Sequence, residues 1–146
     1  STPTGLIVAP TRELALQVFE EIIWLYKKTN LIAVTSIGGM DINKERKKIS
    51  KKFNLLIGTP GRINDHLRKK ALNLSQLSFL VLDEADEMLD LGFREDLDAI
   101  IQSSPINTRK LLFSATLPKK IIILANKYLA NPKKLKYLIK IFPILI

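Results

Sequence analysis

Three carboxylates directly follow a run of hydrophobic residues near the middle of this 146-residue chain. Residues 79–82 are all apolar, and Asp83, Glu84 and Asp86 come immediately after them. Carboxylates held this close repel one another, and burying any of them is costly. A divalent cation would offset the repulsion, and Mg²⁺ prefers one or two carboxylates together with waters and phosphate oxygens. The arrangement therefore suits a metal ion bound beside phosphate groups.

Two interpretations of these acids are open. Acidic residues favour the first turn of a helix, where they interact with its dipole, and an isolated string of this kind is read most simply that way. A hydrophobic run followed by Asp-Glu is also the Walker B pattern of nucleotide hydrolases. There the first carboxylate holds the metal, and the second polarises a water in line with the terminal phosphoryl group.

Small and polar residues follow four other apolar runs. Glycines allow a backbone to approach a phosphate closely, and threonine hydroxyls and arginine guanidinium groups bind its oxygens. Each set also lies near a predicted helix start, which attracts anions. Ordinary turns remain an alternative, as does pairing of Arg12 with Glu13 or a neighbouring helix. The sets are Pro10-Thr11-Arg12-Glu13, Gly38-Gly39, Thr59-Pro60-Gly61-Arg62 and Ser114-Ala115-Thr116.

Short apolar runs alternate with amphipathic stretches along the chain. We predict strands at 5–9, 32–37, 54–57, 79–82 and 110–114. Predicted helices cover 11–28, 41–52, the stretch after 62 to about 70, a region through 97–101, and 118–129. This order predicts an α/β fold with a doubly wound parallel sheet. In such sheets ligands bind beyond the carboxyl ends of the strands, where all the residue sets above are expected.

Composition narrows the class of partner. Lys and Arg number 23 against 14 Asp and Glu, a net charge of +9, which favours nucleic acid first and an anionic membrane second. The chain has no cysteine, which excludes disulfides and thiolate metal sites. Its lone His66 argues against a histidine-based zinc site and is expected to be a surface or helix-face residue without a catalytic part. The basic run 44–52 is expected to be a solvated helix face.

No apolar stretch approaches the ~20 residues of a membrane span, and no signal peptide is visible, so we expect an intracellular protein.

Several motifs in order resemble one family. They are "APTRELA" at 9–15, "GG" at 38–39, "TPGR" at 59–62, "VLDEAD" at 81–86 with "GF" at 92–93, and "SAT" at 114–116. The sequence is similar to the DEAD-box ATP-dependent RNA helicases, specifically their first RecA-like domain, over residues 6–130. The resemblance implies a RecA-like P-loop NTPase domain that uses ATP and Mg²⁺ to unwind RNA duplexes locally or remodel RNA–protein complexes.

The resemblance also implies roles for individual residues. Asp83 would hold Mg²⁺, Glu84 would activate the attacking water, and Asp86 would bond with the 114–116 segment to couple ATP to RNA. The sugar-phosphate backbone of RNA would be contacted, with little sequence preference, by Pro10, Thr11, Arg12, Glu13, Gly38, Gly39, Thr59, Pro60, Gly61 and Arg62.

Two elements of the family do not occur in these 146 residues. No Gly-x-x-x-x-Gly-Lys-Ser/Thr loop occurs, nor do the arginine-rich motifs of a second RecA-like domain. We therefore expect residues 1–135 to be part of a helicase ATP-binding domain that works with such a second domain, and 136–146 to be a tail or truncated linker. By itself the fragment should be inactive. The alternatives are a non-catalytic RNA-binding or scaffolding domain and a DNA-unwinding ATPase, which the D-E-A-D and T-P-G-R spellings disfavour.

Overall fold

The computed structural model describes residues 2–39 and 41–135, so the predicted tail at 136–146 lies outside the described residues. Five parallel strands form one sheet in the order β2-β3-β1-β4-β5. This confirms the predicted α/β class with a parallel sheet. The strands are β1 (Gly5–Val8), β2 (Ala33–Ser36), β3 (Leu55–Gly58), β4 (Phe79–Leu82) and β5 (Arg109–Leu112).

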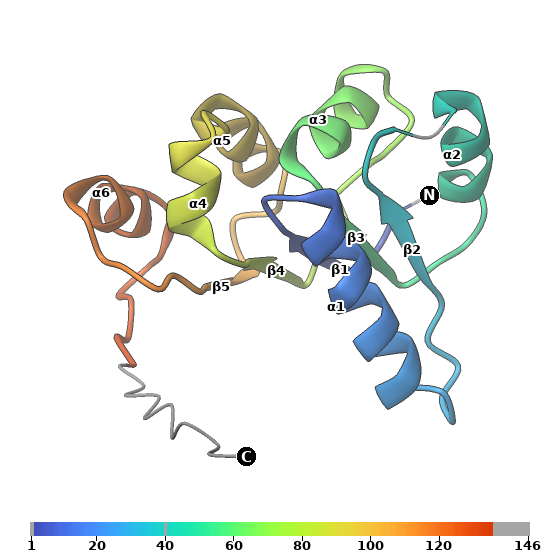
Figure 1. Ribbon diagram of the computed structural model, residues 1–146, viewed down its shortest axis with the longest axis horizontal. Helices are drawn as coiled ribbons and strands as arrows, with labels where there is room; N and C mark the ends of the chain where they lie inside the picture. Colours follow the sequence, from blue (N-terminus) through green and yellow to red (C-terminus); the bar gives the residue numbers. More distant parts are fainter. Residues whose placement is uncertain (1, 40, 136–146) are drawn as a thin grey trace, which may run out of the picture.

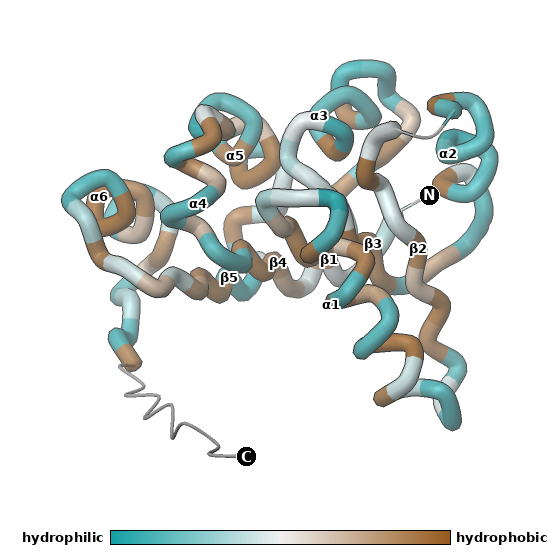
Figure 2. The backbone as a smooth tube through the Cα atoms, in the orientation of Figure 1, coloured by the Kyte–Doolittle hydropathy of each residue, from teal (hydrophilic) through white to brown (hydrophobic). Residues whose placement is uncertain are grey.

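Alternate strand residues supply two separate cores, as the pleat of a strand requires. Leu6, Leu56 and Leu80 belong to the larger core, on the face covered by most of the helices. Leu55 and Ile57 point to the other face and pack with residues of α1. Figure 2 shows the apolar residues gathered along the sheet and on the helix sides that face it. Because side chains pack on both faces, the three central strands β3, β1 and β4 are nearly continuous hydrophobic runs.

The helices are divided unequally between the two faces (Figure 1). α1 lies on one side, against β2 and β3, and α2 to α6 lie on the other. Opposite α4 and α6, the odd-numbered residues of β4 and β5 are left partly open, with Phe79, Leu111 and Phe113 exposed. The helices are α1 (Arg12–Leu25), α2 (Ile42–Ile49), α3 (Pro60–Arg68), α4 (Ala85–Asp90), α5 (Arg94–Gln102) and α6 (Lys119–Tyr128).

The helix boundaries follow local chemistry. Thr11 caps α1, because its side-chain oxygen accepts a hydrogen bond from the Leu14 N–H at 3.2 Å. Asp41 caps α2 in the same way through Asn43. α1 ends at Leu25, three residues before the predicted end at 28. Between α4 and α5 the chain turns at Gly92, whose φ of 86° favours glycine. Among the described residues, no helix has the length and apolar character needed to cross a membrane.

Candidate functional site

The ends of all five strands are joined into one rim by backbone hydrogen bonds. The Thr59 N–H donates to Ser36, Ala9 to Gly58, Asp83 to Val8 and Phe113 to Leu82, at 2.8–3.0 Å. Each of these bonds continues the parallel ladder one residue beyond a strand end. Because the ladder stays in register, the residue sets that follow the strands are held along the same edge of the sheet, as the sequence predicts.

Asp83 and Glu84 occupy the turn between β4 and α4. Glu84 adopts a left-handed conformation with φ 48° and ψ 52°, which is uncommon for a residue other than glycine. The Asp83 carboxylate accepts the Glu84 N–H at 3.0 Å, and the Ala85 N–H donates to Phe113 at the end of β5 at 2.9 Å. A strained backbone that is held on both sides is characteristic of a functional position. The Glu84 side chain is exposed and therefore accessible to a ligand.

The environment of Glu84 raises its pKa to about 7. The first cause is a hydrogen bond shared with Glu87, followed by partial desolvation and by repulsion from the charges of Glu87, Asp83 and Asp86. A carboxyl group with a pKa near neutrality is suited to proton transfer at physiological pH. Four acids within five residues also leave a net negative charge that a bound cation would neutralise.

Asp86 joins the acidic turn to the segment after β5. One carboxylate oxygen of Asp86 accepts the Thr116 hydroxyl at 2.7 Å and the Thr116 N–H at 3.1 Å. Partial burial alone would raise the pKa of Asp86, but hydrogen bonds from Thr116, Glu87 and Ser114 lower it below the ordinary value. The Ser114 hydroxyl donates to the Thr116 carbonyl at 2.7 Å and fixes the shape of the segment. The expected contact is present, and the coupling of ATP to RNA assigned to it stays a prediction.

Two guanidinium groups flank the turn at Gly38 and Gly39. A Cβ at position 39 would lie 2.2 Å from Nη1 of Arg12, and one at position 38 would lie 3.4 Å from Nε and Nη2 of Arg62. Both glycines have positive φ, 70° and 68°. The turn therefore needs glycine for its backbone and for the space that the arginines occupy. Among the described residues Arg12 forms no ion pair, so the pairing with Glu13 weighed above is not found.

The remaining residues of the predicted anion-binding sets surround these arginines at two helix starts. Thr11 precedes α1, and Glu13 is exposed in the first turn of that helix. Pro60 is the first residue of α3, followed by Gly61, and Thr59 precedes both without a capping bond from its hydroxyl. Pro10 is buried behind Thr11. The structure thus brings the Pro10–Glu13, Gly38-Gly39 and Thr59–Arg62 sets together around two cations, whereas Ala115 and its neighbours lie beside the acids.

His66 is not the surface residue expected from the sequence. Its side chain is fully buried, and its Nε2 lies 3.0 Å from an Oε2 of Glu45, which is only 2% exposed. Glu45 belongs to the basic run, whose Lys44, Arg46, Lys47 and Lys48 are exposed as predicted. A signal was available, because Glu45 falls between Ile42 and Ile49 on one helical face. An acid at that position points inward with the isoleucines.

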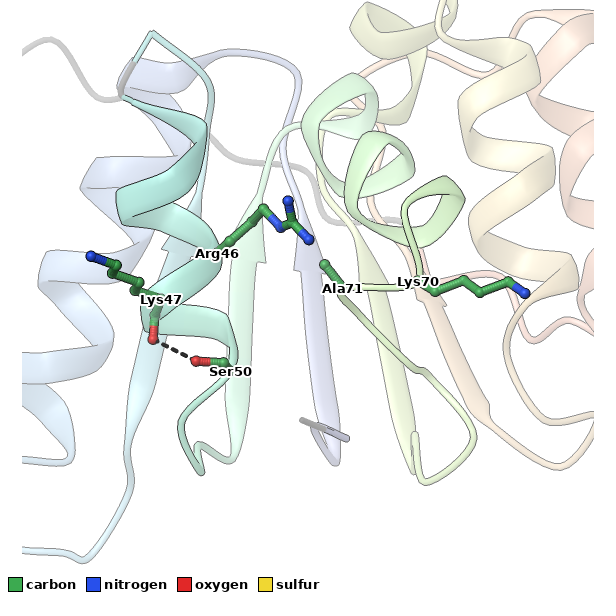
Figure 3. A pocket seen from close by; sticks show the side chains of 5 residues that line it. All are labelled: Arg46, Lys47, Ser50, Lys70 and Ala71. Carbon is green, nitrogen blue, oxygen red and sulfur yellow. Dashed lines mark hydrogen bonds between the residues drawn. The ribbon is translucent and has the colours of Figure 1, made fainter.

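One depression on the surface lies away from this rim. It has a volume of about 440 Å³ and lies between the carboxyl ends of α2 and α3. Figure 3 shows Lys47 and Lys70 pointing outward from it, while Arg46 points toward Ala71. The ends of helices that meet there carry partial negative charge, which offsets the cations. The chemistry-bearing residues instead line an open edge, as suits a long ligand.

No cluster of three or more metal-binding side chains converges within residues 2–39 and 41–135. The donor chemistry nevertheless fits Mg²⁺, which takes one or two carboxylates and completes its shell with waters and phosphate oxygens. Asp83 offers such a carboxylate, and Glu84, Asp86 and Glu87 beside it add negative charge that a cation would offset. The turn therefore suits a metal that arrives with a phosphate ligand.

Comparisons with known proteins agree with this geometry. The family model described as DEAD/DEAH box helicase matches residues 1–123. A relative named DEAD-box ATP-dependent RNA helicase CshA, from Bacillus cereus, is 43% identical over 132 residues, which cover 90% of this chain and 25% of the relative. The ATP-dependent RNA helicase DbpA of Bacillus subtilis is 42% identical over 134 residues, covering 92% and 28%. The chain thus spans about a quarter of the length of these relatives.

A solved structure shares the fold. The crystal structure of a DEAD box protein from the hyperthermophile Methanococcus jannaschii superposes with a TM-score of 0.86 and 43% sequence identity. The match covers 90% of this chain and 36% of that one. At this identity the likeness covers both sequence and fold.

Proposed function

Because this chain belongs to the DEAD/DEAH box helicase family, we propose that the protein carrying it is an ATP-dependent RNA helicase. The observation that carries the proposal is the common rim. It holds the acids after β4 and the two guanidinium groups at the Gly38-Gly39 turn along one edge of the same sheet. A nucleotide at the acids and an RNA strand at the arginines would then share one rigid support.

On the ATP side, the acidic turn supplies the chemistry. Asp83 holds Mg²⁺, which when bound neutralises charge on the phosphates and positions them. Glu84 orients a water and accepts its proton, and its pKa of about 7 leaves it able to do so near neutrality. Its backbone is held in the αL conformation at the turn into α4, and its side chain is exposed.

On the RNA side, the grip is to phosphates and sugars. Arg12 and Arg62 provide bidentate donors beside the backbone of Gly38 and Gly39, and Thr11 and Thr59 provide hydroxyl groups at two helix starts. Such contacts carry no sequence information, so binding should be nearly independent of base sequence. Pro10, Glu13, Pro60 and Gly61 shape this surface. Asp86 and the 114–116 segment connect it to the ATP side.

The wider assignment follows from the family. We infer that a second RecA-like domain closes over this rim, in agreement with relatives of which this chain matches only about a quarter. We also place the protein inside the cell, where its RNA and ATP are found. Residues 1–135 then form part of the first domain.

The decisive experiment is Glu84→Gln in the full-length protein. This variant keeps the shape of the side chain and removes the base, so RNA-stimulated ATP hydrolysis should fall at least ~100-fold while ATP binding persists. Glu95→Gln, at an exposed position on α5, is the matched control and should hydrolyse ATP like wild type. Unchanged turnover in Glu84→Gln would refute the role of Glu84. A single-stranded DNA that stimulates hydrolysis as well as RNA does would point to the DNA-unwinding alternative.

A further inference from the structure

A buried carboxylate lies behind the arginines of the rim. Glu45 sits in the first turn of α2 within a basic run, yet it is only 2% exposed. An acid is almost never buried without partners, because removing its charge from water is costly. The charged residues around it on α2, Lys44, Arg46, Lys47 and Lys48, are exposed, so among the charged side chains of this helix only Glu45 is buried.

Three groups from two other elements converge on Glu45. One oxygen accepts the Ile37 N–H at 2.8 Å, just before the Gly38-Gly39 turn. The other lies 3.0 Å from Nε2 of His66 and 3.3 Å from Nη1 of Arg62. Nδ1 of His66 has no partner among the described residues, so the contact to Glu45 is the polar bond that orients this buried ring. The carboxylate thus ties the end of β2 to two successive turns of α3.

The contact to Arg62 leaves the rest of its guanidinium available. Nη1 faces Glu45, while Nε and Nη2 lie against Gly38, and the side chain is 15% exposed. Arginine has five N–H donors in a planar fork, so a bond to one carboxylate does not exhaust them. The bond to the buried acid restrains the plane of the fork beside the Gly38-Gly39 turn and leaves N–H donors for a phosphate there.

We propose that Glu45 is a positioning residue for the RNA grip, holding Arg62 and the Gly38-Gly39 turn in one fixed arrangement. This inference rests on the proposed function, since it requires that Arg62 binds a phosphate. Glu45 itself does not touch the RNA. It reduces the freedom that Arg62 loses on binding, which is how preorganisation increases affinity.

A double-mutant cycle in the full-length protein tests the proposal. Binding of a labelled short single-stranded RNA is measured by fluorescence anisotropy for Glu45→Gln, Arg62→Ala and the double variant. We expect each single variant to weaken binding about tenfold, the loss of roughly one charge-assisted contact. The double variant should bind within about twofold of Arg62→Ala, because Glu45 acts through Arg62. Asp65→Asn removes a charge from an exposed position of α3 and should leave binding unchanged.

Each other outcome has a distinct meaning. Wild-type binding in Glu45→Gln alongside weak binding in Arg62→Ala would overturn this inference and leave the proposed function intact. If the losses of affinity in Glu45→Gln and Arg62→Ala add up in the double variant, Glu45 has a general structural role, and the inference is overturned. Wild-type binding in Arg62→Ala would remove the RNA role of Arg62, and the inference with it.

A second variant covers the case in which Glu45→Gln fails to fold. Arg62→Lys leaves Glu45 in place and keeps the charge, but lysine lacks the planar fork that spans Glu45 and a phosphate. We expect a loss of affinity close to that of Arg62→Ala, and wild-type affinity in Arg62→Lys would overturn the proposal.

Discussion

Thr116 donates two hydrogen bonds to a single carboxylate oxygen of Asp86, one from its hydroxyl at 2.7 Å and one from its backbone N–H at 3.1 Å. The two residues are 30 positions apart and belong to different strand exits. The bonds also help to lower the pKa of Asp86 below its ordinary value, so the acceptor remains ionised. This contact is a direct mechanical link between the acidic turn and the segment after β5.

We expect Thr116→Val to impair RNA unwinding more than ATP hydrolysis. Valine preserves the shape and the backbone bond but removes the hydroxyl donor, a charge-assisted bond with a net value of about 2 kcal/mol. The rate of duplex unwinding should fall roughly tenfold or more, with a smaller change in RNA-stimulated hydrolysis. Both rates are measured in the full-length protein, with Thr29→Val at the far end of α1 as the control. Equal losses in the two rates would argue against a coupling role.

The raised pKa of Glu84 predicts how stability depends on pH. The folded protein holds the Glu84 proton up to about pH 7, while the unfolded chain releases it near 4.5. Between these values the folded state binds more protons, so the free energy of unfolding falls as pH rises. Glu84→Gln removes this penalty, and its stability relative to wild type should increase from about pH 4.5 to 7 and then level off.

Glu87→Gln tests the cause of that shift. Glu87 contributes the hydrogen bond that raises the pKa of Glu84 most, together with a repulsive charge. Its replacement should therefore lower the pKa of Glu84 and shift to lower pH the range over which the stability of the protein changes. Thermal unfolding of wild type and both variants across this pH range provides the comparison. A stability difference between Glu84→Gln and wild type that does not vary with pH would contradict the assignment.

The strands and their exits were predictable because each is a local signal. A short apolar run identifies a strand, as Phe79–Leu82 illustrates, and a breaker such as Pro10 after β1 marks where a strand ends. Parallel topology then brings the strand ends to one edge of the sheet. The residues that perform chemistry follow from their place in that pattern. No knowledge of side-chain contacts is needed for this step.

The contacts among Glu45, His66 and Arg62 were not predicted, because they depend on how two helices pack. Arg62 and His66 are four apart and share a face of α3, but nothing local shows that α2 presents an acid to that face. Because the run 44–52 is mostly Lys and Arg, its overall charge predicts a solvated face and does not show that Glu45 points inward. The break at Gly92 that separates α4 from α5 was likewise missed, because acids and apolar residues continue on both sides of it.

Salt dependence should report the phosphate contacts one by one. The logarithm of the association constant for single-stranded RNA should fall linearly with the logarithm of the salt concentration. The slope should be about −0.7 for each neutralised phosphate. Arg12→Ala and Arg62→Ala should each make this slope less steep by about 0.7, because each removes one phosphate contact. Lys28→Ala, at an exposed position beyond the end of α1, should not change it. A salt-independent affinity would contradict a grip on the RNA backbone.

Gly39 and Gly92 form a matched pair that separates backbone strain from loss of the arginine site. Both have a positive φ, 68° and 86°, so alanine should destabilise either position by about 1 kcal/mol through its backbone. They differ in surroundings, because a Cβ at position 39 would lie 2.2 Å from Nη1 of Arg12, whereas one at position 92 meets nothing within 4 Å. Gly39→Ala should therefore displace the Arg12 guanidinium and weaken RNA binding about tenfold, as expected for one charge-assisted contact. Gly92→Ala should lose only stability. Thermal unfolding and RNA affinity measured together distinguish the two effects, and equal affinities in the two variants would show that Arg12 does not need its place against the turn to bind RNA.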